Sequence, residues 1–133
     1  MTEICGPAPG PRVVLIEDDP LVLFGQEMLL KDWGYRVVTG TCQAEIAQAL
    51  ADAPDDVAAI IADFNLGGEQ TGADVARAVA ASAHRAVPTV VMSASLGRRS
   101  GEAAALQGFA FLQKPVDPDE LRDWLVMATA ARN

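Results

Sequence analysis

Residues 13–20 read VVLIEDDP, and the architecture of the chain can be inferred from this segment. Its first four residues are all apolar, whereas a strand with one wet face would alternate apolar and polar residues. A continuous run of this kind is typical of a parallel strand covered on both faces. Asp19 followed by Pro20 predicts a helix start, because aspartate caps free backbone N–H groups and proline suits the first helical position. Glu17 and Asp18 stand between the strand and the helix.

The same alternation of apolar run and helical segment recurs along the chain. Further strands are predicted at residues 35–38, 57–62, 87–92 and 109–112. Helices are predicted from Pro20 to just before Gly34, around 46–50, at 73–83, at 102–107 and from Pro118 onward; Leu21, Phe24 and Met28 mark the first by their helical spacing. Strands alternating with helices imply right-handed crossovers and a parallel sheet between two helical layers. The predicted fold class is therefore α/β, a doubly wound (βα)5 sandwich.

Composition limits the class of protein. The chain has 133 residues, half of them hydrophobic, with 18 acidic and 10 basic side chains and a net charge of −8. This length and apolar content fit one globular domain, predicted over residues 12–133 after a proline- and glycine-rich tail or linker at 1–11. The acidity disfavours direct binding to nucleic acid or to an anionic membrane. Without a secretory signal or a transmembrane run, a cytoplasmic location is expected.

Charged and polar residues stand where the predicted strands end. Glu17 and Asp18 follow the first strand, Asp63 the third, Ser93 the fourth and Lys114 the fifth. In doubly wound sheets the ligand site lies at these carboxyl ends. Packed carboxylates repel one another, and a hard cation such as Mg²⁺ (or Mn²⁺) relieves that repulsion. Since a carboxylate can also attack phosphorus, the cluster predicts phosphoryl transfer through an aspartyl phosphate.

The ordered set of Glu17-Asp18, Asp63, Ser93-Ala94 and Lys114-Pro115, each at its own strand end, resembles that of response-regulator receiver domains of two-component signalling. The resemblance covers residues 12 to about 131. It implies the flavodoxin-like fold of chemotaxis regulators, with five parallel strands in the order 2-1-3-4-5. Residues 12–133 are accordingly identified as a receiver domain.

The resemblance also implies a role for each site residue. Asp63 matches the phosphoacceptor, Asp18 a direct metal ligand and Glu17 an acid that acts through metal-bound water. Asn65 matches the position whose backbone carbonyl completes the metal ligands.

Three further positions carry implied roles in catalysis and switching. Lys114 matches the lysine that pairs with the phosphoryl group, and its bond to Pro115 matches one that is usually cis. Ser93 matches the hydroxyl that contacts the phosphoryl oxygen. Phe111 matches the switch aromatic of the fifth strand, although Phe109 and Phe111 are equally explained as core residues.

The implied partners are a histidine kinase or histidine phosphotransfer protein as donor and a downstream protein as target. The target would contact the face formed by the fourth helix, the fifth strand and the last helix. Such a switch catalyses its own phosphorylation and dephosphorylation, so it is an enzyme only in a loose sense. The sequence is compatible with two origins: a stand-alone regulator, or a receiver cut from a hybrid histidine kinase.

Two other functions are alternatives to this one. A degenerate receiver would bind proteins without phosphorylation, which the complete residue set disfavours. A phosphatase that forms an aspartyl phosphate needs a second acid two residues after the nucleophile, where this chain has Asn65. The loop at 65–72 lacks the proline common in receivers and is one residue longer, and its glycines could alter access to the metal. The remaining acids, including Asp55 and Asp56, are expected to be ordinary surface charges.

Overall fold

The computed structural model describes residues 10–66, 70–83, 86–94 and 108–130. The strands are β1 (Arg12–Ile16), β2 (Arg36–Gly40), β3 (Ala59–Asp63), β4 (Thr89–Ser93) and β5 (Ala110–Gln113). The helices are α1 (Pro20–Asp32), α2 (Gln43–Ala49), α3 (Gly72–Ser82) and α5 (Pro118–Ala130). The helix predicted at 102–107 lies outside the described residues. None of the described helices is both long and apolar enough to cross a bilayer.

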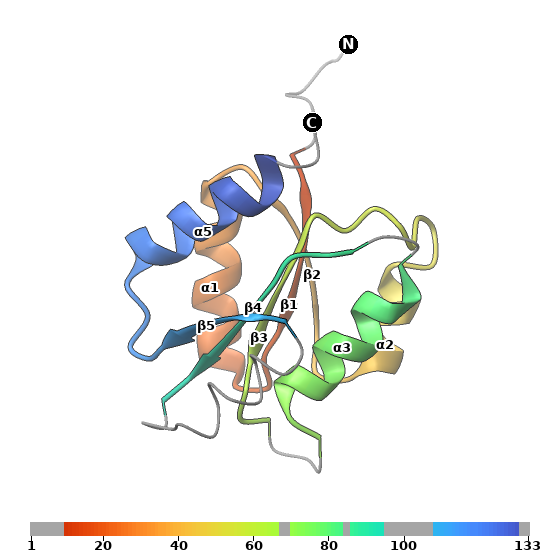
Figure 1. Cartoon of the computed structure of the whole chain (residues 1–133), viewed down its shortest axis with the longest axis horizontal. Coiled ribbons are helices and arrows are strands. Elements are labelled where there is room, and N and C mark those ends of the chain that lie inside the picture. Colours follow the sequence, from red (N-terminus) through yellow and green to blue (C-terminus); the bar gives the residue numbers. More distant parts are fainter. Residues whose placement is uncertain (1–9, 67–69, 84–85, 95–107, 131–133) are drawn as a thin grey trace.

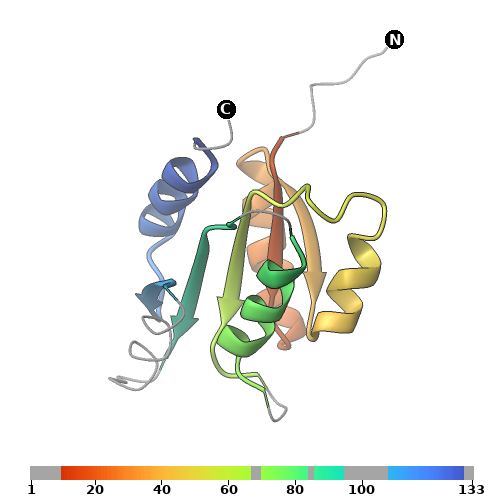
Figure 2. The same ribbon diagram turned by 45° about the vertical axis from the view of Figure 1, so that its right-hand side comes forward.

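The five strands form one parallel sheet in the order β2-β1-β3-β4-β5, which confirms the predicted fold class and strand order. Helices α1 and α5 cover one face, and α2 and α3 cover the other (Figures 1 and 2). Strands β1, β3 and β4 are buried along their whole length, as continuous apolar runs predict. Alternate residues point to opposite faces: Val14 and Ile16 pack toward α2 and α3, whereas Val13 and Leu15 pack toward α1 and α5.

Local capping explains where the helices begin and end. Asp19 accepts hydrogen bonds from the backbone N–H groups of Leu21 (2.9 Å) and Val22, and Pro20 occupies the first helical position, as predicted. Gly34 follows the end of α1 with a φ of 98°, a conformation that favours glycine. The Asp19 cap starts α1 only three residues after Glu17, and Gly34 lets the chain turn from α1 toward β2.

Helix α1 buries a different side from the one suggested by its most regular apolar spacing. Leu21, Phe24 and Met28 are 84%, 64% and 56% exposed, whereas Leu30 is fully buried. The spacing correctly predicted a helix but did not identify its buried face. The buried side instead packs Leu30 and Leu23 against the sheet and α5.

At the amino-terminal edge of the sheet, Arg12 is nearly buried and bound on several sides. Its guanidinium donates to the backbone carbonyls of Asp56 (2.8 Å) and Ala53, and it pairs with the Asp52 carboxylate at 3.4 Å. Arg36 pairs with the Asp56 carboxylate at 2.9 Å. The expectation that Asp56 is an ordinary surface charge is therefore wrong, because its carboxylate and carbonyl tie β1 and β2 to the segment before β3.

Candidate functional site

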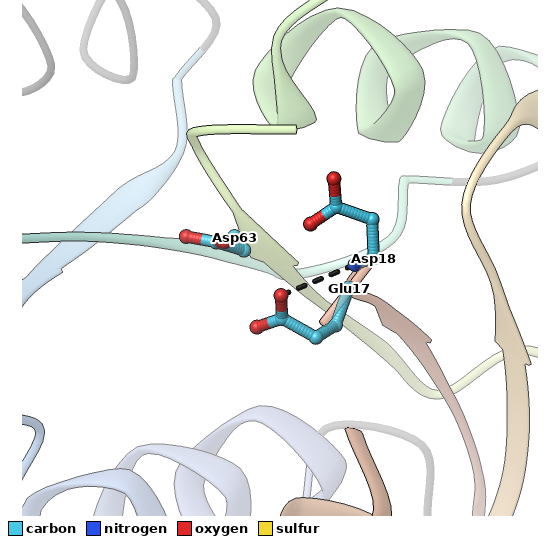
Figure 3. A group of neighbouring side chains, drawn as sticks. All are labelled: Glu17, Asp18 and Asp63. Atoms are coloured by element: carbon cyan, nitrogen blue, oxygen red, sulfur yellow. Dashed lines mark hydrogen bonds between the residues drawn. The ribbon is translucent and has the colours of Figure 1, made fainter. Parts of the chain in front are cut away.

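Three carboxylates converge at the carboxyl-terminal edge of the sheet (Figure 3). Glu17 and Asp18 directly follow β1, and Asp63 is the last residue of the neighbouring strand β3. Each offers an oxygen atom, and these oxygens lie within 4.8 Å of one another. Glu17 is 1% and Asp63 6% exposed, whereas Asp18 faces solvent. Two of the three carboxylates are therefore buried, and the cluster is open to solvent on the side of Asp18.

Lys114 brings a positive charge to this cluster. Its Nζ lies 3.0 Å from Oδ1 of Asp63 and 3.8 Å from Oε1 of Glu17. The backbone N–H of Lys114 donates to the carbonyl of Ser93 at 2.8 Å, which anchors the end of β5 to that of β4. The Lys114–Pro115 peptide bond is cis, as the resemblance implied. The lysine predicted from the fifth strand end thus reaches the acid of the third.

The Glu17 carboxylate is only half satisfied by hydrogen bonds. Its Oε2 accepts the backbone N–H groups of Asp18 and Asp19, each at 3.1 Å, whereas its Oε1 is buried without a hydrogen-bond partner among the described residues. Burial is the main cause that raises the pKa of Glu17 above its ordinary value, and the charge of Asp63 adds to it. The backbone N–H of Asp19 and the ammonium of Lys114 act in the opposite direction.

This donor set fits a divalent cation. Among the described residues, three carboxylates face one ammonium group, so this part of the cluster carries uncompensated negative charge when its acids are ionised. The buried Oε1 of Glu17, for which the described part of the chain supplies no hydrogen bond, is an available oxygen donor. Hard cations such as Mg²⁺ prefer oxygen ligands and keep several waters, which the exposed side at Asp18 permits.

Ser93 and Asn65 meet beside Asp63. Ser93 is fully buried at the end of β4, which pairs with β3. The side-chain amide of Asn65 donates to the Ser93 hydroxyl at 3.4 Å. Phe111 is half-buried in the middle of β5 and packs with Ala73 and Val91. The structure therefore brings Ser93 and Asn65 to the acids, while Phe111 lies in a small apolar cluster.

Gly72 positions α3 beside the site, a role that the sequence pattern alone does not reveal. A Cβ atom at Gly72 would lie 1.8 Å from the backbone oxygen of Asp63, so only glycine allows α3 to approach this strand end. The N–H of Gly72 donates to the carbonyl of Phe64 at 2.9 Å, and the Thr71–Asp74 capping box starts α3 at this point. Thr71-Gly72 followed by Asp74 is a capping signal, but the close approach becomes visible only in three dimensions.

Comparison with known families identifies the class of this protein. Residues 13–126 match the model of the response regulator receiver domain. The chain belongs to this family of two-component signalling domains, as the residues at the strand ends indicated.

Solved structures agree on the fold. A response regulator receiver domain from Clostridium thermocellum is 19% identical, with a TM-score of 0.75 over 91% of this chain and 95% of that one. The Vibrio cholerae chemotaxis protein CheY4 is 22% identical, with a TM-score of 0.73 over 88% and 97%. The receiver domain of a Pseudomonas aeruginosa sensor histidine kinase, described with a magnesium ion coordinated in its active-site cleft, is 25% identical, with a TM-score of 0.72 over 91% and 98%. Among curated proteins, none matches significantly.

Proposed function

We propose that this receiver accepts a phosphoryl group on Asp63 from a phosphohistidine donor in a magnesium-dependent reaction. The observation that carries the proposal is the contact of Lys114 with Asp63 at 3.0 Å, inside a cluster of three carboxylates. A buried carboxylate with a fixed ammonium group beside it can attack a phosphorus atom whose charge that ammonium neutralises. The donor would be a histidine kinase or a histidine phosphotransfer protein.

In the transfer, a bond forms between a carboxylate oxygen of Asp63 and phosphorus, and the bond from phosphorus to the donor nitrogen breaks. The electron pair of the broken bond stays on that nitrogen, so a donor ring protonated on its other nitrogen leaves as neutral imidazole. Lys114 is already held between Asp63 and Glu17, where its ammonium group would neutralise the incoming charge. Such fixed donors lower the barrier because they need little reorganisation during the reaction.

Glu17, Asp18 and Asp63, together with the backbone carbonyl of Asn65, would hold the metal, with Glu17 acting through a water molecule. When bound, Mg²⁺ or Mn²⁺ supplies charge neutralisation for the carboxylates and the phosphoryl group. The magnesium ion described for the Pseudomonas aeruginosa receiver supports this assignment.

Phosphorylation would act on the rest of the molecule through Ser93 and Phe111. The Ser93 hydroxyl would turn from Asn65 to a phosphoryl oxygen, and Phe111 would repack on β5. The changed face, formed by the fourth helix expected from the sequence together with β5 and α5, would bind a downstream protein. We place this protein in the cytoplasm, where such donors and targets meet.

Labelling with acetyl phosphate tests the proposal. With Mg²⁺, intact-mass spectrometry should show the gain of one phosphoryl group in the wild type and in the matched control Asp32→Asn, an exposed acid at the end of α1. Asp63→Asn should show none, and Lys114→Met should label about 100-fold more slowly. Failure of the wild type to label with acetyl phosphate or with any kinase would favour a phosphorylation-independent binding module. Continuous turnover of small phosphate esters would favour a phosphatase.

A further inference from the structure

The negative charge of the chain is concentrated around the edge of the sheet that holds Asp63. In a doubly wound sheet, a helix that follows a strand starts at the carboxyl end of that strand, so acids at helix starts surround one edge. Six such acids lie there among the described residues, and all are exposed except the half-buried Asp74. We call this group the acidic rim: Asp19, Glu45, Asp74, Asp117, Asp119 and Glu120.

The acidic rim stays uncompensated even when the site inside it is neutral. The three carboxylates of Glu17, Asp18 and Asp63 would be balanced by Lys114 and one divalent cation. Glu17 is 1% exposed, and its Oε1 receives no hydrogen bond from the described residues, so the centre of this edge is itself suited to positive charge. The six acids of the rim add to that centre without a base of their own among the described residues.

Elsewhere in the described part of the chain, acids and bases nearly balance. Six acids stand against five bases there, and the cluster of Arg12 and Arg36 with its acids is an example. The residues outside the described ranges add three acids and four bases, which are too few to offset the acidic rim wherever they lie. The net charge of −8 therefore arises at the edge that holds Asp63.

Helix stabilisation explains only part of this arrangement. The helix dipole favours acids at helix starts, and it equally favours bases at helix ends. The first turns of α2, α3 and α5 hold acids, whereas the last turns of these three helices hold no base. The dipoles are thus matched by side-chain charge at one end only. The resulting negative field acts on any molecule that approaches Asp63.

We propose that the acidic rim selects the phosphoryl donor by charge, so that the preferred donor is a protein whose phosphohistidine is surrounded by basic side chains. This inference rests on the proposed phosphoryl transfer to Asp63 and adds the chemistry of the partner. The rim repels small anionic donors, and it attracts and orients a donor with a basic surface.

The surface beside the open side of the site also suits a protein donor. Leu21 and Phe24 are 84% and 64% exposed, and Leu21 stands three residues after the exposed Asp18. Large exposed apolar side chains next to a polar site are typical of protein contacts. A folded donor can use this apolar surface together with the charge of the acidic rim, whereas a small anion can use neither.

Phosphohistidine peptides of opposite charge test the selection. A histidine peptide flanked by lysines and the same peptide flanked by glutamates are phosphorylated chemically and offered to the wild type with saturating Mg²⁺. At low salt, the lysine-flanked peptide should label Asp63 at least about tenfold faster than the glutamate-flanked one. At about 0.5 M salt the two rates should converge, because the Debye length falls to about 4 Å. A ratio near one at low salt, or a ratio that salt does not change, would overturn the proposal.

Acetyl phosphate provides the opposite salt dependence. It is a small dianion, so its labelling of Asp63 should become faster as salt screens the acidic rim, whereas labelling by the lysine-flanked peptide should become slower. Both series keep Mg²⁺ saturating. Equal salt dependence for the two donors would contradict selection by charge.

A variant of the acidic rim locates the effect. Glu45→Gln, Asp119→Asn and Glu120→Gln combined remove three charges and leave the hydrogen bonds at Thr41, because glutamine keeps the accepting oxygen. This variant should lower the rate ratio of the two peptides at least about threefold.

The matched control removes three charges from the opposite edge. Asp32→Asn, Asp52→Asn and Asp55→Asn change exposed acids at the end of α1 and before β3, and together they should leave the rate ratio close to that of the wild type. Equal reductions in the rim variant and in this control would show that net charge alone matters and would overturn the proposal.

Peptide binding separates donor selection from phosphoryl transfer. The unphosphorylated lysine-flanked peptide needs no metal, and fluorescence anisotropy should show at least about threefold weaker binding to the rim variant than to the control variant. Equal binding would contradict the acidic rim as the contact surface. Failure of every donor to label Asp63 would refute the proposed phosphoryl transfer and donor selection with it. Labelling without a charge preference would refute donor selection alone.

Discussion

Both edges of the sheet hold buried charge, but they differ in how the described residues balance acidic groups with basic ones. At the amino-terminal edge, two arginines, Arg12 and Arg36, meet two acids, Asp52 and Asp56. At the carboxyl-terminal edge, three acids meet only one lysine, Lys114, among the described residues.

This difference distinguishes a cluster of charges that stabilises the fold from one whose excess charge is available for binding. Arg12 directs its donors at backbone carbonyls as well as carboxylates, so the amino-terminal edge is compensated within the chain. At the other edge, Oε1 of Glu17 is buried and receives no hydrogen bond from the residues that the structure describes, and burial raises the pKa of that carboxyl. Uncompensated negative charge costs stability unless a cation is added. The imbalance itself therefore supports the proposal that this edge binds a metal and a phosphoryl group.

The largest effect is expected at the compensated edge. Arg12→Met should lower the free energy of unfolding by about 3 kcal/mol, because two backbone carbonyls lose their donor and the carboxylates of Asp52 and Asp56 lose an ion-pair partner. Urea unfolding measures this change. Arg77→Met, at an exposed position on α3, serves as the control and should change stability by less than about 0.5 kcal/mol. Similar small losses in both variants would show that the Arg12 network contributes little.

Magnesium should stabilise the protein through the other edge. At ten times its dissociation constant, a ligand specific to the folded state adds about 1.4 kcal/mol to the free energy of unfolding. The wild type and Arg12→Met should both show this gain in thermal melts, because Arg12 lies at the opposite edge. Asp63→Asn should lose most of it. A gain that survives in Asp63→Asn would place the metal elsewhere.

Without metal, Asp63→Asn should be more stable than the wild type by about 1 kcal/mol, since one of three repelling carboxylates is removed. Loss of the Lys114 contact opposes this gain, but Lys114 keeps Glu17 as a partner at 3.8 Å. Denaturant unfolding in EDTA gives the measurement, and Asp32→Asn is the control at an exposed acid. An equally or less stable Asp63→Asn would mean that the ion pair outweighs the repulsion.

The smallest effect is a pH dependence at Glu17. Because its pKa is raised in the folded state, folding takes up a proton between the ordinary value of 4.5 and the higher folded value. The stability that Glu17 contributes is fully present below pH 4.5 and is lost as the pH rises through the folded pKa. Glu17→Gln stays neutral, so in EDTA its stability relative to the wild type should increase over this window and then level off. A difference independent of pH would contradict the raised pKa.

The sequence predicted the acids and the lysine because a parallel sheet brings its carboxyl ends together. A correct prediction of where the strands end was enough to place Glu17, Asp63 and Lys114 in one site. Arg12 and Asp56 were not predicted as partners, because they are 44 residues apart and the path of the segment before β3 is not encoded in any periodic pattern. The roles of Ser93 and Phe111 in switching, and of the Asn65 carbonyl in metal binding, remain predictions.

The buried face of α1 shows a second limit. Leucines and other apolar residues occur on several sides of this helix, so the spacing of Leu21, Phe24 and Met28 predicted its presence but not its orientation. Orientation depends on which side meets the sheet and α5, and that contact is set by tertiary packing around Leu30.

Chemical trapping of the phosphorylated residue tests the central claim most directly. Borohydride reduces an aspartyl phosphate to homoserine, which peptide mass spectrometry can locate. After treatment with acetyl phosphate and Mg²⁺, homoserine should appear at position 63 alone, and EDTA should abolish it. Homoserine at another acid, or equal modification of Asp63 with and without magnesium, would contradict the assignment of this edge as a metal-dependent phosphoacceptor site.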